Sequence, residues 1–450
     1  MYILYYANIS YNSVLEYGPA VGGLLMFFAG TWGGIMEDKT FRKGLTVAAI
    51  ILIVITAILM SLSSTNGILY GTEAVLYGIP FIAAVAIMLL AILIILTRFY
   101  TRTDTIEEML GAIAVRYGIF GWCFIFIIKF ASVLLNIFCY DFYSEHFASI
   151  YVILNSINVC VIGTTVLAIA LRKLPVVKIE KRKMKIGQLL LLIMMMYGLT
   201  QVGSMMGLPI HMLLTSFSSF TADSEDAINE LSNNVVFSSG TLIRIITIGI
   251  LPAIFEELLF RKFLIDRTIR YGEFISCALS GIMFGLWHGN FQQFFFAFFI
   301  GVLFAFVYIR TGNIIYTMIM HASVNLVTST ITVELLSELM KRMGFDFANG
   351  TVNTDIDYDA VMQSVLPLMA LLLLWLVILA SFQIVGFVML IVKRKKFKLA
   401  AMPGEPARKT ILHTMTHSVP MWIFFTFAIL LFVYAYVPDI LAAILSLAGK

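Results

Sequence analysis

Long apolar runs separated by short polar connections occupy most of the chain. A helix needs about 20 apolar residues to cross a hydrocarbon core of roughly 30 Å. Runs of about this length recur from end to end and predict about twelve transmembrane helices. They cover approximately 17–35, 44–63, 76–97, 118–138, 148–171, 187–207, 240–265, 273–289, 291–309, 313–330, 361–392 and 419–446. The pattern therefore predicts an all-α, polytopic membrane helix bundle.

The composition agrees with this pattern. Of the 450 residues, 60% are hydrophobic and 12% are charged, whereas about a quarter of a soluble domain is charged. The net charge of +4 does not indicate a nucleic-acid partner, because most Lys and Arg residues lie in short connections, where they act as topology signals. The four cysteines show no CxxC spacing, so neither a disulfide framework nor a thiolate zinc site is predicted.

If each predicted helix crosses the membrane once, nearly all the basic connections lie on one side of it, as the positive-inside rule requires. They are Lys39–Lys43, Arg98–Arg116, Arg172–Lys185, Lys262–Arg270 and Lys393–Lys409, and only Lys341 and Arg342 lie on the wrong side. This places the N-terminus outside and Lys183 in the cytoplasm. The first ten residues show no signal peptide, so we expect the first membrane helix to direct insertion into the plasma membrane.

Three blocks divide the predicted helices. Residues 1–186 form an N-terminal accessory block, 187–335 form a central core, and 336–450 hold a polar loop and two further helices. The central block concentrates ionisable residues within apolar runs. Such residues cost on the order of 3 kcal/mol at mid-membrane, so they normally face a protein interior or a wet cavity.

Three motifs in the central block each use an i, i+4 step, which places both ends on one helix face. They are EExxxR, FxxxH and HxxxN, formed by Glu256, Glu257, Arg261, Phe284, His288, His321 and Asn325. Glu257 can pair with Arg261, leaving Glu256, about 100° round the axis, free to point elsewhere. We therefore expect three helices to direct polar faces toward one pocket.

The residue types in these motifs fit two kinds of hydrolysis. In one, a carboxylate activates water while His and Asn donate to an oxyanion. In the other, two imidazoles and a carboxylate hold a divalent metal such as Zn with an open position for water. Glu256, His288 and His321 are the candidate ligands for that metal.

The three motifs in this order resemble the CPBP family of intramembrane endopeptidases, also called the CAAX protease and bacteriocin-processing or Abi family. The resemblance covers roughly 245–330. It implies that Glu256 activates water with the help of His288, and that His321 and Asn325 bind the oxyanion. Glu257 with Arg261 would orient the first helix. It further implies a peptide or protein substrate in or near the membrane, and both metalloprotease and glutamate-dependent mechanisms have been assigned to relatives.

Two other functions remain open for the same fold. One is a non-proteolytic membrane regulator or immunity-type partner protein, which the large accessory blocks favour. The other is a proton-coupled transporter with Glu256, His288 and His321 as a relay, although no second copy of the motifs is present. Glu257 with Arg261 could also be a structural ion pair only.

Three further features receive structural interpretations. His413 and His417 have a metal-like i, i+4 spacing, but a solvated helix face explains them without a third ligand. Arg244 lies in an apolar run, where pairing or snorkelling is expected. The Phe-rich run 291–308 is predicted to be a lipid-facing helix.

Overall fold

The computed structural model describes residues 39–65, 79–219, 239–346, 351–352, 358–400 and 405–448. Within these ranges the protein is helical apart from two paired two-residue strands, β1 (Phe345–Asp346) and β2 (Thr351–Val352). The chain divides into two compact units. The first is built from residues up to Leu134 with Thr165–Pro175 and Lys409–Leu430, and the second from the remainder.

The predicted helical membrane bundle is confirmed, but its count of about twelve spans is not supported. Seven described helices are long and apolar enough to cross a membrane, or up to eight if the bent pair Arg408–His417 and Met421–Val437 is one span. The predicted span 17–35 lies outside the described residues. Two other predicted spans are shorter apolar helices, Ala83–Phe99 and Glu273–Trp287. The segment 240–265 is absent from the candidate spans among described helices, and it carries the acidic pair and Arg261.

The first unit is centred on a helix whose middle is buried. Its elements are α3 (Lys39–Thr65), α4 (Ile79–Phe99), α5 (Ile106–Trp122), η3 (Cys123–Ile127), most of α6 (Ile128–Phe138), α9 (Thr164–Leu171), α21 (Arg408–His417) and the first part of α22 (Met421–Ala448). Every residue of α5 from Met109 to Gly121 is buried. A capping box of Thr105 and Glu108 begins this helix by satisfying backbone amides at its first turn.

Arg116, buried within α5, links three segments of the first unit. Its guanidinium donates to the carbonyls of Ala170 at 2.9 Å, Tyr100 at 3.0 Å and Thr97 at 3.2 Å. Buried cations persist where such acceptors replace water. Arg116 therefore ties α5 to the end of α4 and to α9.

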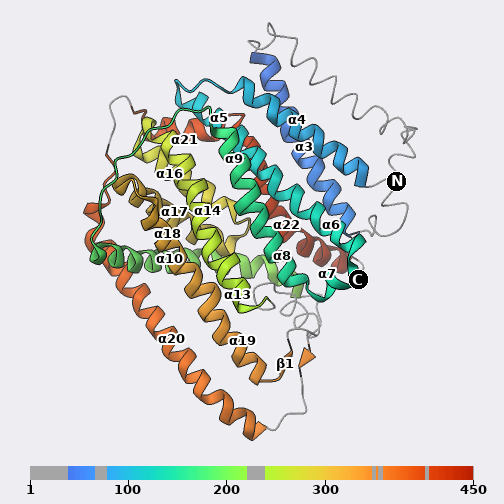
Figure 1. Ribbon diagram of the computed structural model, residues 1–450, viewed down its shortest axis with the longest axis vertical. Coiled ribbons are helices and arrows are strands. Elements are labelled where there is room, and N and C mark those ends of the chain that lie inside the picture. Colours follow the sequence, from blue (N-terminus) through green and yellow to red (C-terminus); the bar gives the residue numbers. More distant parts are fainter. Residues whose placement is uncertain are drawn as a thin grey trace. The chain divides into compact units, whose positions relative to one another are not determined.

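The second unit carries the three motifs. Its elements are α7 (Tyr140–Glu145), α8 (Phe147–Ser156), η4 (Ile157–Gly163), α10 (Ile186–Ser219), α13 (Thr241–Arg244), η5 (Ile245–Ile250), α14 (Leu251–Glu257), η6 (Leu258–Phe263), α15 (Leu264–Thr268), η7 (Ile269–Tyr271), α16 (Glu273–Trp287), α17 (Phe291–Thr311), α18 (Ile314–Leu326), η8 (Val327–Ile331), α19 (Thr332–Arg342), α20 (Tyr358–Lys393), η9 (Arg394–Lys396) and the end of α22. Helix α17 packs against α10, α16 and α18 (Figure 1). The predicted division at 186 and 335 stays a prediction.

Glycines allow α10 to lie very close to α17. A Cβ at Gly203 would meet the Phe296 backbone at 2.3 Å, and one at Gly207 would meet the Phe291 carbonyl oxygen at 2.1 Å. Gly203 and Gly207 form a GxxxG motif, which brings helix backbones together in membranes. Helix α17 is thus an interior helix along this face.

We expect Gly207→Ala to destabilise the protein, because the added methyl group must displace the α17 backbone. Overpacking of this kind costs about 1–3 kcal/mol. Gly187→Ala on the same helix is the matched control, since a Cβ there meets nothing within 4 Å. Thermal unfolding of the detergent-purified variants should show a lower Tm for Gly207→Ala alone. Equal Tm values for the two would contradict the close approach.

Basic connections of the second unit meet at one end. The Val177 amide donates to the Asp266 carbonyl at 2.7 Å, and the Arg182 amide donates to the Thr311 carbonyl at 2.7 Å. Arg310, at the end of α17, donates to the Lys398 carbonyl at 2.6 Å. These contacts bring basic connections of the second unit to one end, while their cytoplasmic placement stays a prediction.

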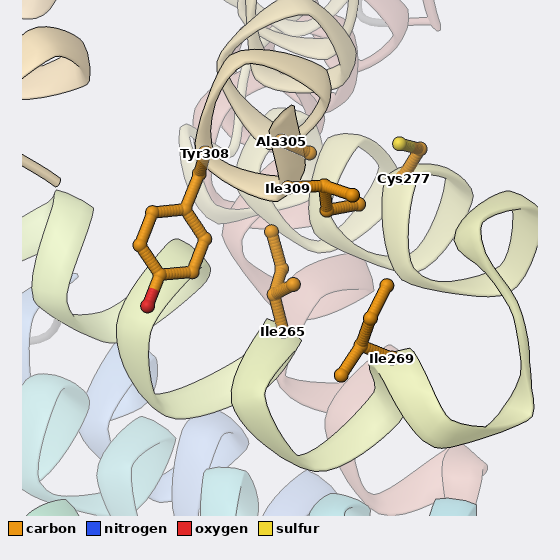
Figure 2. Packing of buried hydrophobic residues seen from close by; sticks show 6 residues of the cluster. All are labelled: Ile265, Ile269, Cys277, Ala305, Tyr308 and Ile309. Atoms are coloured by element: carbon orange, nitrogen blue, oxygen red, sulfur yellow. The ribbon is translucent and has the colours of Figure 1, made fainter. Parts of the chain in front are cut away.

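A hydrophobic cluster lies beside these connections and joins α15, α16 and α17. Figure 2 shows Ala305, Tyr308 and Ile309 of α17 facing Ile265, Ile269 and Cys277. The Tyr308 hydroxyl donates to Asp266 at 2.7 Å, and Lys262 pairs with the same carboxylate at 2.7 Å. These contacts fix the helix that carries Glu256 and Glu257 onto α17.

Candidate active site

The acidic pair lies on a helical run in which α-helix and π-helix alternate. Glu256 and Glu257 end α14, and Arg261 lies in the following π-helix η6. A second π-helix, η5, precedes α14, and Pro252 lies in the first turn of α14. π-helical turns are rare and frequent at functional sites. The local backbone is therefore irregular on both sides of the acidic pair.

Glu257 joins two helices through a buried ionic network. Its Oε2 lies 3.2 Å from Arg261 Nε, and its Oε1 lies 2.9 Å from His321 Nδ1 on α18. The side chains of Glu257 and Arg261 are 0% exposed. Because a carboxylate oxygen only accepts, Nδ1 of His321 carries a hydrogen. The predicted pair of Glu257 with Arg261 is confirmed, and His321 is its third member.

Glu256 lies on the opposite edge of the His321 ring. Its Oε2 is 3.7 Å from His321 Nε2, and its side chain keeps 15% of its surface exposed. The separation is short enough for one water molecule to bind both atoms. Glu256 thus points away from the Glu257–Arg261 pair, as the helical spacing predicted, and is the more accessible of the two carboxylates.

Two aromatic rings form a wall behind these charges. The Arg261 guanidinium carbon lies 4.4 Å from the centroid of Phe284 and 5.1 Å from that of Phe304. The His321 ring contacts the same two rings, with centroid separations of 5.6 and 5.7 Å. Aromatic faces stabilise a desolvated guanidinium, so this wall holds Arg261 and His321 in place.

Phe304 corrects the lipid-facing interpretation of run 291–308. This side chain is 0% exposed, and α17 packs against α10, α16 and α18. The sequence contained a signal for this packing, because Gly301 interrupts the aromatic run and small residues mark close helix contacts. A Cβ at Gly301 would meet the Gly281 Cα and the Phe284 ring, both at 3.1 Å.

His288 lies at the C-terminal end of α16, where it packs against Phe284. The two ring centroids are 5.0 Å apart, and His288 Nδ1 lies 2.8 Å from the Phe284 carbonyl oxygen. Since a carbonyl oxygen only accepts, Nδ1 is the donor of this hydrogen bond. His288 and His321 therefore pack against one shared ring, from α16 and α18 respectively.

Asn325 lies one turn after His321 on α18. Its side-chain amide donates to the Ile248 carbonyl in η5 at 3.0 Å. The predicted i, i+4 step of HxxxN is thus realised on one helix, and a π-helical carbonyl orients the amide. All six predicted residues belong to the second unit. The structure links Glu256, Glu257, Arg261 and His321 directly, joins His288 through Phe284, and attaches Asn325 to the same helical run.

The other predicted features have structural partners. Arg244 is buried and pairs with Glu334 of α19, so the expected pairing is confirmed. His413 and His417 stack with a centroid separation of 3.8 Å on α21 in the first unit. Arg342, on the disfavoured side of the charge pattern, pairs with Glu338 at 2.9 Å.

The described side chains at this site do not form a metal-binding group. Across the described ranges, no three His, Cys, Asp or Glu side chains are arranged to hold a metal ion. The metal set of Glu256, His288 and His321, and with it the description as a metalloprotease, is not supported.

Comparison with known proteins agrees with this geometry. Residues 238–327 match the model of the family described as type II CAAX prenyl endopeptidase Rce1-like. This match supports a CAAX-type protease family for the segment and confirms the resemblance seen in its three motifs. No curated protein and no solved structure matches the chain. The matched segment runs from the start of α13 to the end of α18 and contains all six predicted site residues.

Proposed function

We propose that this integral membrane protein is a glutamate-dependent intramembrane endopeptidase that cleaves a peptide bond in a membrane-embedded or membrane-proximal substrate. The observation that carries the proposal is the position of Glu256, whose carboxylate faces His321 at 3.7 Å beside a buried ionic network. A carboxylate next to an imidazole can hold a water molecule for attack on a carbonyl carbon.

In the proposed reaction, Glu256 takes a proton from that water as its oxygen forms a bond to the scissile carbonyl carbon. The carbonyl π electrons move onto oxygen and create an oxyanion. Protonated Nε2 of His321 and the second N–H of the Asn325 amide donate to this oxyanion. When the intermediate collapses, the C–N bond breaks and Glu256 returns its proton to the leaving amine.

The remaining residues have supporting roles in this proposal. Glu257 accepts from His321 Nδ1 at 2.9 Å and orients the imidazole so that Nε2 faces Glu256. Arg261 balances the charge of Glu257 and keeps it from competing with Glu256 for the water. His288 offers Nε2, which can orient the attacking water or the substrate.

A comparison of membrane peptides tests this function and identifies the substrate. Cells expressing Glu256→Ala should accumulate an uncleaved membrane peptide that cells expressing the wild-type protein convert to two products. Mass spectrometry of the membrane fraction measures both forms. A non-proteolytic regulator would keep its phenotype with Glu256→Ala, and unchanged peptide profiles would refute the protease.

We further propose that Lys183 faces the cytoplasm of a plasma membrane protein whose N-terminus is outside. Lys183 is exposed, and the neighbouring Arg182 amide binds the Thr311 carbonyl at the basic end of the second unit. In a variant with its four native cysteines replaced, Lys183→Cys should react with a membrane-impermeant maleimide only after the cells are permeabilised. Labelling in intact cells would reverse the orientation.

A further inference from the structure

The turn that carries His288 is tightly constructed. Residues 288–290 connect α16 to α17, and Gly289 adopts a positive φ of 66° that favours glycine. The Asn290 side chain donates to the His288 carbonyl at 2.9 Å and accepts from the Gln293 amide at 2.9 Å. The position of His288 therefore depends on how α17 begins.

Helix α22 covers this turn from outside the family-matched segment. A Cβ at Gly289 would meet the Leu431 Cβ at 2.6 Å, so α22 touches the turn there. The Phe432 ring lies 5.0 Å from Phe291 between centroids, and the Tyr436 ring lies 5.7 Å from Phe291. Three α22 side chains thus contact the turn or the first residue of α17.

The Tyr436 hydroxyl makes a polar contact at the same place. It accepts from the Phe291 backbone amide at 2.7 Å and lies 3.0 Å from His211 Nδ1 on α10. The first amides of a helix have no partner within it. Tyr436, which is 4% exposed, supplies one from another helix and also shares a hydrogen bond with His211. One hydroxyl therefore joins α10, α17 and α22.

We propose that Tyr436 is a positioning residue for His288. By binding the Phe291 amide it fixes the start of α17 and, through the 288–290 turn, the orientation of the His288 imidazole. The inference rests on the proposed proteolytic function. It gives the C-terminal helix α22 a role in a site whose motifs all lie within residues 238–327.

Hydrogen–deuterium exchange on the full-length protein in lipid nanodiscs tests the positioning directly. Tyr436→Phe keeps the ring and removes the hydroxyl, so exchange at the Phe291 amide should rise by about tenfold or more. Tyr434→Phe is the matched control, because Tyr434 lies on the same helix and is 52% exposed. His211→Leu should raise exchange at the same amide to a smaller extent, which provides a second variant if Tyr436→Phe folds poorly.

The activity measurement uses the peptide that the Glu256→Ala membrane comparison identifies, synthesised with a fluorophore and a quencher. Tyr436→Phe should lower kcat by about tenfold with little change in KM, because the catalytic geometry loosens while substrate binding remains. Its Tm should stay close to that of Tyr434→Phe. A purely structural role would lower Tm and the yield of folded protein without changing kcat per folded molecule.

The outcomes separate this inference from the proposed function. Unchanged exchange at Phe291, or a kcat equal to that of Tyr434→Phe, would overturn the role of Tyr436 while Glu256→Ala stays inactive. If Glu256→Ala retained cleavage, the proposed function would fail instead, and the link from Tyr436 to catalysis would fail with it. Increased exchange with a lowered kcat supports the inference.

Discussion

Glu256→Gln is expected to reduce peptide cleavage by on the order of 10⁴-fold, the upper range for a general base. The amide keeps the size of the side chain but cannot take a proton from water. We expect KM to change little, because Glu256 acts on the water and not on substrate binding. The variant should remain folded, since Glu256 is partly exposed and the buried charges belong to Glu257 and Arg261.

The kinetic measurement compares kcat of purified Glu256→Gln with that of wild type on the identified substrate. Glu338→Gln is the control, because this exposed glutamate pairs with Arg342 on α19. Its kcat should equal that of wild type. Glu256→Asp should retain partial activity, since the carboxylate is preserved but withdrawn by one methylene. Full activity of Glu256→Gln would show that Glu256 is not the general base.

Arg261→Met is expected to produce the largest loss of stability. Removing one partner of a buried ion pair costs about 3–5 kcal/mol, because the other charge stays in a low-dielectric interior. Among the described residues, Glu257 would retain His321 as its ionic partner at 2.9 Å. The cation contacts with Phe284 and Phe304 would be lost as well.

The chain offers a matched control for this substitution. Arg342 and Glu338 form another i, i+4 pair, but their side chains are 41% and 44% exposed. Exposed pairs of this kind contribute about 0–1 kcal/mol. Arg342→Met should therefore leave the Tm of the detergent-purified protein nearly unchanged, while Arg261→Met lowers it. Equal effects would show that the Glu257–Arg261 pair is not buried in the functional protein.

The site could be found from the sequence because its ionisable side chains are energetically unfavourable within a membrane. Glu256, Glu257, Arg261 and His321 stood out as ionisable groups in apolar runs, and i, i+4 spacing placed Glu257 beside Arg261. Long apolar runs likewise predicted a helical bundle. These features depend on local composition and helical geometry, which one chain reveals.

Features that depend on contacts between helices were missed. Gly301 marks a close helix contact in the run 291–308, but the pattern does not say which phenylalanine faces the site, and Phe304 lies against Arg261 and His321. The link from His321 to Glu257 joins residues 64 positions apart, beyond the reach of periodicity. The described helices do not support the predicted span count, partly because apolar length alone does not separate a full crossing from the 15-residue helix α16.

The alternation of α-helix and π-helix around Glu256 makes this run more sensitive to deletions than to substitutions. An ion pair holds each end of the run: Arg244 pairs with Glu334 at one end, and Glu257 pairs with His321 at the other. A π-helical turn equals one residue inserted into an α-helix, and one residue turns a helix by about 100°. Deletion of one residue within η5 would therefore rotate Arg244 or Glu257 away from its ionic partner. Point substitutions at the same positions would leave both ion pairs in place.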